Sequence, residues 1–419
     1  MNIVDQKFAA LEYDLFVEKS LDRVTPEREK ELTDLIRKYN DRLSRREVYS
    51  RLAALKKEAQ NPSTYHEFAY YAKSYGIFGI KRYRSSTGEK IYRLPVLSFN
   101  MNDWRDHFTN TYLIVGKELT LIDCGTVLSE QYMHKCFEVV SHYFGENISV
   151  ADLDNVIITH AHIDHYGGLS FLREQMKPNG RIFAHEDDAE TIEDVPGALR
   201  KTQTVIKDFL HSAGIQADNL EEMLDMYMSS KKTMKGCPVT DRLTDGMEII
   251  DGYKILHVPG HCSGQINIIV GDVIFLGDQV LMDITPHQFP SFYMKGMGLV
   301  HYITSLLKVA AVTKNIRLGL ASHNHEVLDV SGRAMEIIDA HHERMADIMS
   351  ILDEPKTLNQ ITTEYFQQIE GKIVSGYDSI LALEEILAHL EYLEKAMNCV
   401  TPIASNDPDD PVLHYQRSY

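Results

Sequence analysis

Residues 155–168 read NVIITHAHIDHYGG, and this stretch decides the fold that we expect. The run NVIIT predicts a short buried strand, and the polar residues after it predict a loop at the carboxyl end of that strand. The two glycines at the end let the backbone turn tightly into a following helix. The loop between them carries four side chains of the metal-binding type: His160, His162, Asp164 and His165.

These residue types suit a transition metal. Imidazole binds zinc and neighbouring metals well, and a carboxylate adds a charge-neutralising oxygen ligand. His160 and His162 can converge on one ion because Ala161 points away, whereas Asp164 and His165 can address a second ion. The alternative is a chance cluster of surface histidines in a chain with 19 His. The position of the motif behind a strand and before Gly-Gly argues against that alternative.

Other short apolar runs predict a sheet whose strands deliver further polar residues at their ends. They lie at 92–99, 111–115, 119–123, 247–258, 266–270, 273–277 and 316–322. Helical spacing predicts a helix at 129–144, and the polar, Met-rich stretch 186–240 is interpreted as a helical lid or insertion.

The two ends of the chain differ from this pattern. Residues 1–85 are predicted to form a helical extension, in which Thr25-Pro26 caps a helix with apolar residues at helical spacing. Residues 331–400 are predicted to be a small helical domain of the winged-helix type, although their five Lys and Arg against thirteen Asp and Glu disfavour DNA binding. Residues 401–419 are rich in Pro and Asp and are predicted to be disordered.

Composition limits the partners and the compartment. The formal charge of −18, from 43 Lys and Arg against 61 Asp and Glu, disfavours nucleic acid as a partner. The five cysteines include no Cys-x-x-Cys pair and are interpreted as free thiols, and the first residues lack the pattern of a signal peptide. We therefore expect a cytoplasmic protein with a small-molecule substrate, no membrane partner, and helical regions that would mediate any homo-oligomer.

Five motifs in order resemble those of the metallo-β-lactamase superfamily over about residues 92–330. They are Asp123 in LIDCG, the run HAHIDH, His261 in VPGHCSG, Asp278 in FLGDQ and His323 in ASHNH. The resemblance implies an α/β fold, the αββα sandwich of that superfamily at 86–330. The stretches DITPHQFP and AHHERMADIM further resemble a subgroup with a glyoxalase-II-like core and a C-terminal winged-helix-like domain.

The resemblance also implies roles for these residues. His160, His162 and His261 would hold one metal ion, Asp164, His165 and His323 a second ion, and Asp278 would bridge the two. Asp123 would hydrogen-bond the ligand shell. His325 competes with His323 for the last position, and we prefer His323 because it follows a predicted strand. Two zinc ions are expected, with iron or manganese, one or two per chain, as alternatives.

The activity that the resemblance implies is hydrolysis of an acyl thioester, ester or lactone by a metal-bridging hydroxide, with Asp164 orienting the nucleophile. Histidine at 162, where iron-dependent relatives carry Glu, favours hydrolysis. The alternatives are a mono-iron thiol or persulfide dioxygenase, a phosphodiesterase or ribonuclease, and a non-catalytic binding protein. His287 and Tyr293 are candidate donors to the leaving group.

Overall fold

The computed structural model describes residues 80–99, 107–215, 234–323, 325–374, 377–404 and 411–418. The helical extension predicted for the N-terminal residues therefore lies, up to residue 79, outside the described residues. The chain divides into two compact units. Unit 1 contains the described residues up to 158 together with Ile163–Phe183 and Ser322–Glu326, and unit 2 contains Thr159–His162, Ala184–Ala321 and the described residues from Val327 onward.

The first sheet begins earlier than the sequence predicted. Its strands, in spatial order, are β1 (Lys81–Arg84), β2 (Lys90–Phe99), β3 (His107–Val115), β4 (Leu119–Ile122), β5 (Asn155–Ile157), β6 (Arg181–His185) and β7 (Asp241–Leu243). Strand β1 falls in the range assigned to the helical extension, and it forms because its backbone pairs antiparallel with β2. The predicted runs 111–115 and 119–123 form a hairpin, in which Val115 of β3 pairs with Leu119 of β4.

The middle of this sheet is buried, which explains its largely apolar sequence. Strands β4, β5 and β6 run parallel to one another, and every residue of β4 and β5 is buried. Parallel strands covered on both faces carry apolar runs of this kind. The α-helices in the described part of unit 1 are α5 (Glu130–Phe144), α6 (Ile163–Tyr166) and α7 (Leu169–Gln175).

The second sheet lies in unit 2 and has the order β12-β11-β10-β9-β8. Its strands are β8 (Glu248–Ile249), β9 (Tyr253–His257), β10 (Ile266–Val270), β11 (Val273–Gly277) and β12 (Leu318–Ala321). The run at 247–258 is thus two strands rather than one. Ile250 and Asp251 have positive φ angles of 47°, so the backbone turns there and β8 pairs with β9.

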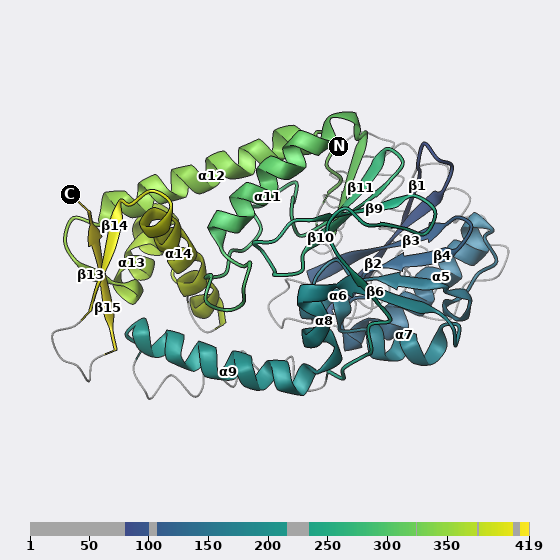
Figure 1. Ribbon diagram of the computed structural model, residues 1–419, viewed down its shortest axis with the longest axis horizontal. Helices are drawn as coiled ribbons and strands as arrows, with labels where there is room; N and C mark the ends of the chain where they lie inside the picture. The colour runs from purple at the N-terminus through teal and green to yellow at the C-terminus, as the bar shows by residue number, and fades with distance from the viewer. Residues whose placement is uncertain are drawn as a thin grey trace, which may run out of the picture. The chain divides into compact units, whose positions relative to one another are not determined.

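Helices make up much of the remaining described part of unit 2 (Figure 1). They are α8 (Glu186–Glu193), α9 (Val195–Ser212), α11 (Leu299–Val312), α12 (Val330–Ile351), α13 (Leu358–Glu364) and α14 (Tyr377–Lys395). Helices α11 and α12 share one apolar core with β11 and β12. Among the described residues, no helix combines the length and the apolar character needed to cross a membrane.

The C-terminal region is less purely helical and less separate than predicted. A three-stranded sheet of β13 (Lys356–Thr357), β15 (Leu413–Arg417) and β14 (Val400–Ala404) accompanies α12, α13 and α14. The prediction that residues 401–419 are disordered is wrong for these strands, because β14 pairs with β15 and Tyr415 is buried in the apolar core of the region. Ile206, Phe209 and Leu210 of α9 belong to that same core.

Tyr415 tests whether the last strand stabilises this core. Replacing Tyr415 with Ala should lower the free energy of unfolding by about 3 kcal/mol, because a large buried ring is lost. Its neighbour in the same strand provides the control, since Gln416→Ala should change the free energy by about 0.5 kcal/mol or less. Urea unfolding followed by circular dichroism would measure both, and equal effects would show that Tyr415 is not packed as described.

Candidate metal centre

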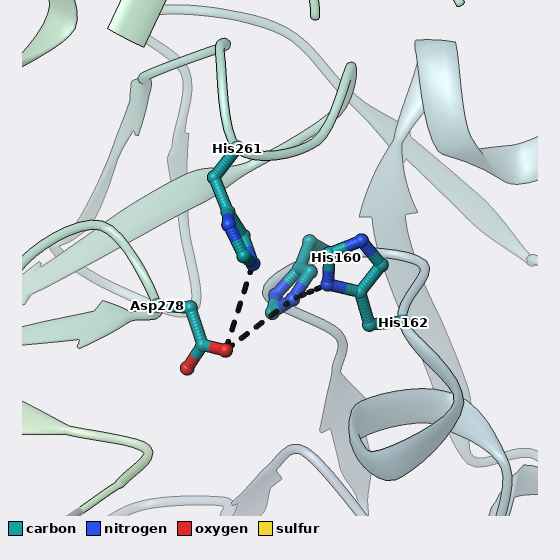
Figure 2. Close-up of side chains that lie close together, drawn as sticks. All are labelled: His160, His162, His261 and Asp278. Carbon is teal, nitrogen blue, oxygen red and sulfur yellow. Dashed lines mark hydrogen bonds and ion pairs between the residues drawn. The ribbon is translucent and has the colours of Figure 1, made fainter. Parts of the chain in front are cut away.

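Four ligand-type side chains of unit 2 point toward one another, and we call them the first cluster (Figure 2). His160 Nε2 lies 2.9 Å from His162 Nδ1. Asp278 Oδ2 lies 3.6 Å from His261 Nε2 and 4.0 Å from His160 Nε2. His160 and His261 are buried, with only 1% and 4% of their surfaces exposed. The structure therefore brings together three histidines and one carboxylate from three separate sequence motifs.

Glycines before two of these ligands allow the close packing. Gly260, with φ +135°, precedes His261, and a Cβ there would lie 2.3 Å from the backbone of Tyr302. Gly277, with φ +52°, precedes Asp278, and a Cβ there would lie 2.4 Å from a buried glutamine side chain. Both positions combine a left-handed φ with no space for a side chain, so each requires glycine.

The outer nitrogens of these rings have partners in the protein. His160 Nδ1 pairs with Thr159 Oγ1 at 3.0 Å, and His261 Nδ1 donates to the carbonyl oxygen of His287 at 2.8 Å. His261 Nε2 is buried and makes no hydrogen bond within the described part of the chain. A buried nitrogen without a bonding partner is costly in an apo site and is satisfied when a metal binds.

A second cluster lies in unit 1 and consists of Asp164, His165 and His323. Asp164 Oδ2 lies 3.4 Å from His165 Nε2 and 3.3 Å from His323 Nε2, and it also accepts from Thr109 Oγ1 at 3.1 Å. Burial alone would raise the pKa of Asp164, but the two neighbouring imidazoles hold that pKa well below its usual range. Asp164 is therefore an ionised carboxylate in a buried setting.

Asp123 stands behind this second cluster. Its Oδ2 accepts from His165 Nδ1 at 2.8 Å and from Ser322 Oγ at 3.3 Å. The residue is fully buried and has a φ of 59°, a conformation that is uncommon for a residue other than glycine. This hydrogen bond fixes which nitrogen of His165 faces the cluster, as a carboxylate partner does for a metal-binding histidine.

The distances within both clusters fit a metal ion. Tetrahedral ligands about 2.0–2.1 Å from zinc lie about 3.4 Å from one another. The separations of 3.3 and 3.4 Å around Asp164 match that spacing, and those in the first cluster, of 2.9, 3.6 and 4.0 Å, lie on either side of it. Nitrogen and carboxylate donors in this ratio are the set that zinc and neighbouring metals prefer.

The sequence model of the metallo-β-lactamase superfamily matches residues 104–317. The chain belongs to the metallo-β-lactamase superfamily. A relative, the probable metallo-hydrolase YqjP of Bacillus subtilis (strain 168), is 22% identical over 294 residues, or 68% of this chain and 86% of that protein.

Two solved structures support the fold. A metallo-β-lactamase family protein of Thermus thermophilus has a TM-score of 0.60 at 22% identity, covering 78% of this chain and 98% of that chain. A β-lactamase domain protein of Burkholderia ambifaria has a TM-score of 0.62 at 19% identity, covering 81% and 94%. The predicted α/β class and metallo-β-lactamase fold are confirmed, and the chain is a superfamily member of the metallo-hydrolase kind.

His323 and not His325 lies in the second cluster of this superfamily member. His323 Nδ1 donates to the carbonyl oxygen of Phe108 at 3.0 Å, which leaves Nε2 facing Asp164. The superfamily match ends at residue 317, before either histidine. The choice between them therefore depends on the structure.

Sequence reasoning missed Asp188, which joins two of the ligand loops in unit 2. Its carboxylate accepts from the backbone N–H of Ala161 at 2.7 Å and from that of Gly264 at 2.8 Å. Ala161 lies between two ligands of the first cluster, and Gly264 follows His261 by three residues. One signal was available in the sequence. Asp188 lies three residues after the strand RIFAH at 181–185, and the recognised motifs also follow strands.

Cys262, which adjoins His261, is held by the same carboxylate. Its Sγ lies 3.4 and 3.5 Å from the two oxygens of Asp188. Burial and the adjacent Asp188 raise the pKa of this thiol well above its usual range. Cys262 therefore remains a protonated, buried thiol, which agrees with its interpretation as a small hydrophobic residue.

Two further groups of ligand-type side chains occur among the described residues, and both lie outside the five motifs. In the group of His185, Asp187 and His257, His185 Nδ1 accepts from the backbone of Asp187 and His257 Nε2 donates to the carbonyl of Ser263. In the group of His341, Glu385 and His389, the two imidazoles bond each other at 2.9 Å. Burial and the neighbouring histidine lower the pKa of His185 to about 4, so that ring is neutral.

The two predicted leaving-group donors turn toward helix α14. His287 lies 3.3 Å from Glu384 and 3.3 Å from Glu385, and the Tyr293 hydroxyl donates to Glu384 at 2.5 Å. Burial alone would lower the pKa of His287, but the two carboxylates raise it to about 9. Both side chains therefore act in packing contacts within the protein, which is the ordinary alternative to a donor role.

The last ligand can be tested with paired variants. His323→Ala should bind about one equivalent of zinc fewer than the wild type, because Asp164 and His165 alone supply too few ligands. His325→Ala should retain the wild-type zinc content. Elemental analysis of both purified proteins measures the difference, and the opposite result would assign the ligand to His325.

Asp188 can be tested against its neighbour. Asp188→Asn should cost about 1–3 kcal/mol of unfolding free energy, because one amide oxygen cannot accept all three donors and the amide NH₂ faces another donor. Asp187→Asn is the control, since the Asp187 side chain is 51% exposed, and it should change stability by about 0.5 kcal/mol or less. Thermal unfolding of the two metal-free proteins compares them, and equal stability would contradict the role of Asp188.

Proposed function

We propose that this chain is a hydrolase that holds two divalent metal ions, most suitably zinc, and cleaves an acyl thioester, ester or lactone. The observation that carries the proposal is the gathering of seven ligand-type side chains into two clusters with ligand-like spacing. The first cluster, of His160, His162, His261 and Asp278, would hold one ion. The second, of Asp164, His165 and His323, would hold the other.

Chain connectivity supports a cooperating pair of ions. His162 belongs to the first cluster and Asp164 to the second, and only Ile163 separates them in the sequence. Two residues of extended chain span at most about 7 Å, so the loop itself limits the distance between the two ligands. Two-metal hydrolases keep their ions about 3.5–4 Å apart. By the superfamily resemblance, Asp278 would be a ligand shared by the two ions.

The proposed chemistry divides between the ions and the protein. A bound pair of divalent ions lowers the pKa of water to near neutrality and polarises a carbonyl oxygen. Asp164 contributes an ionised carboxylate that can orient the attacking water, because its two imidazole neighbours stabilise the charge. Asp123 accepts a hydrogen bond of 2.8 Å from His165 Nδ1, which keeps His165 Nε2 turned toward Asp164.

An aromatic side chain favours an acyl substrate over a phosphodiester. The half-buried ring of Phe289 lies 5.3 Å from that of His162 and 6.0 Å from that of His261, measured between centroids. An apolar wall beside the first cluster suits a hydrocarbon acyl group. The net charge of −18 opposes binding of a polyanionic strand, which makes the nuclease alternative weaker.

A substrate panel with metal analysis tests the proposal. The zinc-loaded chain should contain two ions and turn over members of a set of acyl-CoA, glutathione thioester, ester and lactone substrates. His160→Ala should lower kcat/KM by more than about 100-fold, beyond the usual effect of changing a partner of a metal ligand. His301→Ala, an exposed histidine on α11, is the control and should retain full activity.

Each alternative gives a different result. Turnover of phosphodiesters alone would replace the acyl substrate class, and oxygen consumption by a protein with one iron would indicate the dioxygenase. A fully active His160→Ala protein would show that the activity does not depend on the metal site.

A further inference from the structure

Helix α14 contacts the segment that follows Asp278 through three carboxylates. This segment joins β11 to α11, and its described contacts with the helix fall between residues 287 and 293. Gln288 N–H donates to Glu385 Oε2 at 2.7 Å, Ser291 N–H donates to Glu391 Oε2 at 2.7 Å, and the Tyr293 hydroxyl donates to Glu384. These partners are 91 to 100 residues apart in the sequence.

Two of the three carboxylates meet at one residue. His287 places Nε2 3.3 Å from Glu384 Oε2 and Nδ1 3.3 Å from Glu385 Oε2. Both ring nitrogens are thus held, so the imidazole cannot rotate without losing a contact. Glu384 is fully buried, and Arg344 of α12 binds Glu385 at 2.6 Å. The two carboxylates that hold His287 are therefore themselves held in place, Glu384 by burial and Glu385 by Arg344.

The backbone of His287 reaches the first cluster. Its carbonyl oxygen accepts from His261 Nδ1 at 2.8 Å, and His261 Nε2 then faces Asp278. A metal-binding histidine commonly donates its outer N–H to a carbonyl or carboxylate, which fixes its tautomer and ring orientation. A shift of the His287 backbone would therefore tilt the His261 ring and move the nitrogen that faces the ion.

We propose that Glu384 and Glu385 of helix α14 are positioning residues for the metal ligand His261, and that they act through His287. This inference rests on the proposed function, because it takes the first cluster to be a metal site. By this proposal, the C-terminal helix α14 contributes to the orientation of a metal ligand. The third carboxylate, Glu391, binds Ser291 and has no described contact with His287, so it anchors the segment without reaching the ligand.

The difference between these carboxylates supplies a matched test. The test variant carries Glu384→Gln and Glu385→Gln together. The control is Glu391→Gln alone, because Glu391 lies on the same helix and contacts the same segment. Zinc affinity is measured for the full chain by competition with a chelator. The binding step of the first cluster is identified as the step that disappears in His162→Ala.

The double variant should bind zinc about 10–100-fold more weakly at that step, as expected for loss of groups that orient a ligand. Glu391→Gln should change the affinity by less than about threefold, even where it lowers the thermal stability of the metal-free protein. A folded double variant with unchanged zinc affinity and only a lower melting temperature would overturn the proposal. The two glutamates would then contribute to stability but not to the orientation of His261.

A milder variant covers the case in which the double variant does not fold. Tyr293→Phe removes only the hydroxyl that binds Glu384, and it should weaken the same zinc step by a few-fold while Ser291→Ala does not. Equal zinc affinities for Tyr293→Phe, Glu384→Gln and the wild type would overturn the proposal. These outcomes remain distinct from failure of the proposed hydrolysis, because zinc affinity is measured whether or not any substrate is cleaved.

Discussion

The two clusters depend on hydrogen bonds that fix the orientation of their imidazole rings. In both clusters the outer nitrogen pairs with a protein group, and the inner nitrogen faces the other ligands. The outer partners are Thr159 for His160, Asp123 for His165, the carbonyl of His287 for His261 and the carbonyl of Phe108 for His323. In the pair His185–His257 the facing nitrogens are bound by backbone groups, whereas His341 and His389 bond each other at 2.9 Å, as His160 and His162 do. The two clusters differ from the pair His341–His389 in that their residues lie in the motifs that resemble the superfamily.

The ligands could be predicted from the sequence because their motifs follow strands, although Asp164 and His165 lie in the short helix α6. Apolar runs reveal strands, and a glycine beside His261 or Asp278 marks the close packing. The supporting residues could not be predicted in this way. Asp188 resembles Asp187 beside it, and only the fold decides which of the two reaches Ala161 and Gly264. The carboxylates of α14 are equally ordinary members of an amphipathic helix until tertiary contacts choose their partners.

The wrong predictions share one cause, which is that short strands gain their stability from pairing rather than from local preference. Strand β1 follows a region of helical pattern and forms through its ladder with β2. Residues 401–419 have the composition of a disordered tail, yet β14 and β15 pair with each other and Tyr415 is buried. Composition describes a segment as a whole. The five-residue strand β15 is instead held by its pairing with β14 and by the burial of one side chain, Tyr415.

The separation of 97 residues between His287 and its partner Glu384 has a consequence for biosynthesis. A ribosome completes the segments that carry His160, His261 and Asp278 well before it makes helix α14. Until that helix emerges, His287 has no carboxylates to hold it, and the ring of His261 has an unrestrained acceptor. The nascent chain would therefore gain a rigid first cluster only after helix α14 has been made and has bound the side chain of His287.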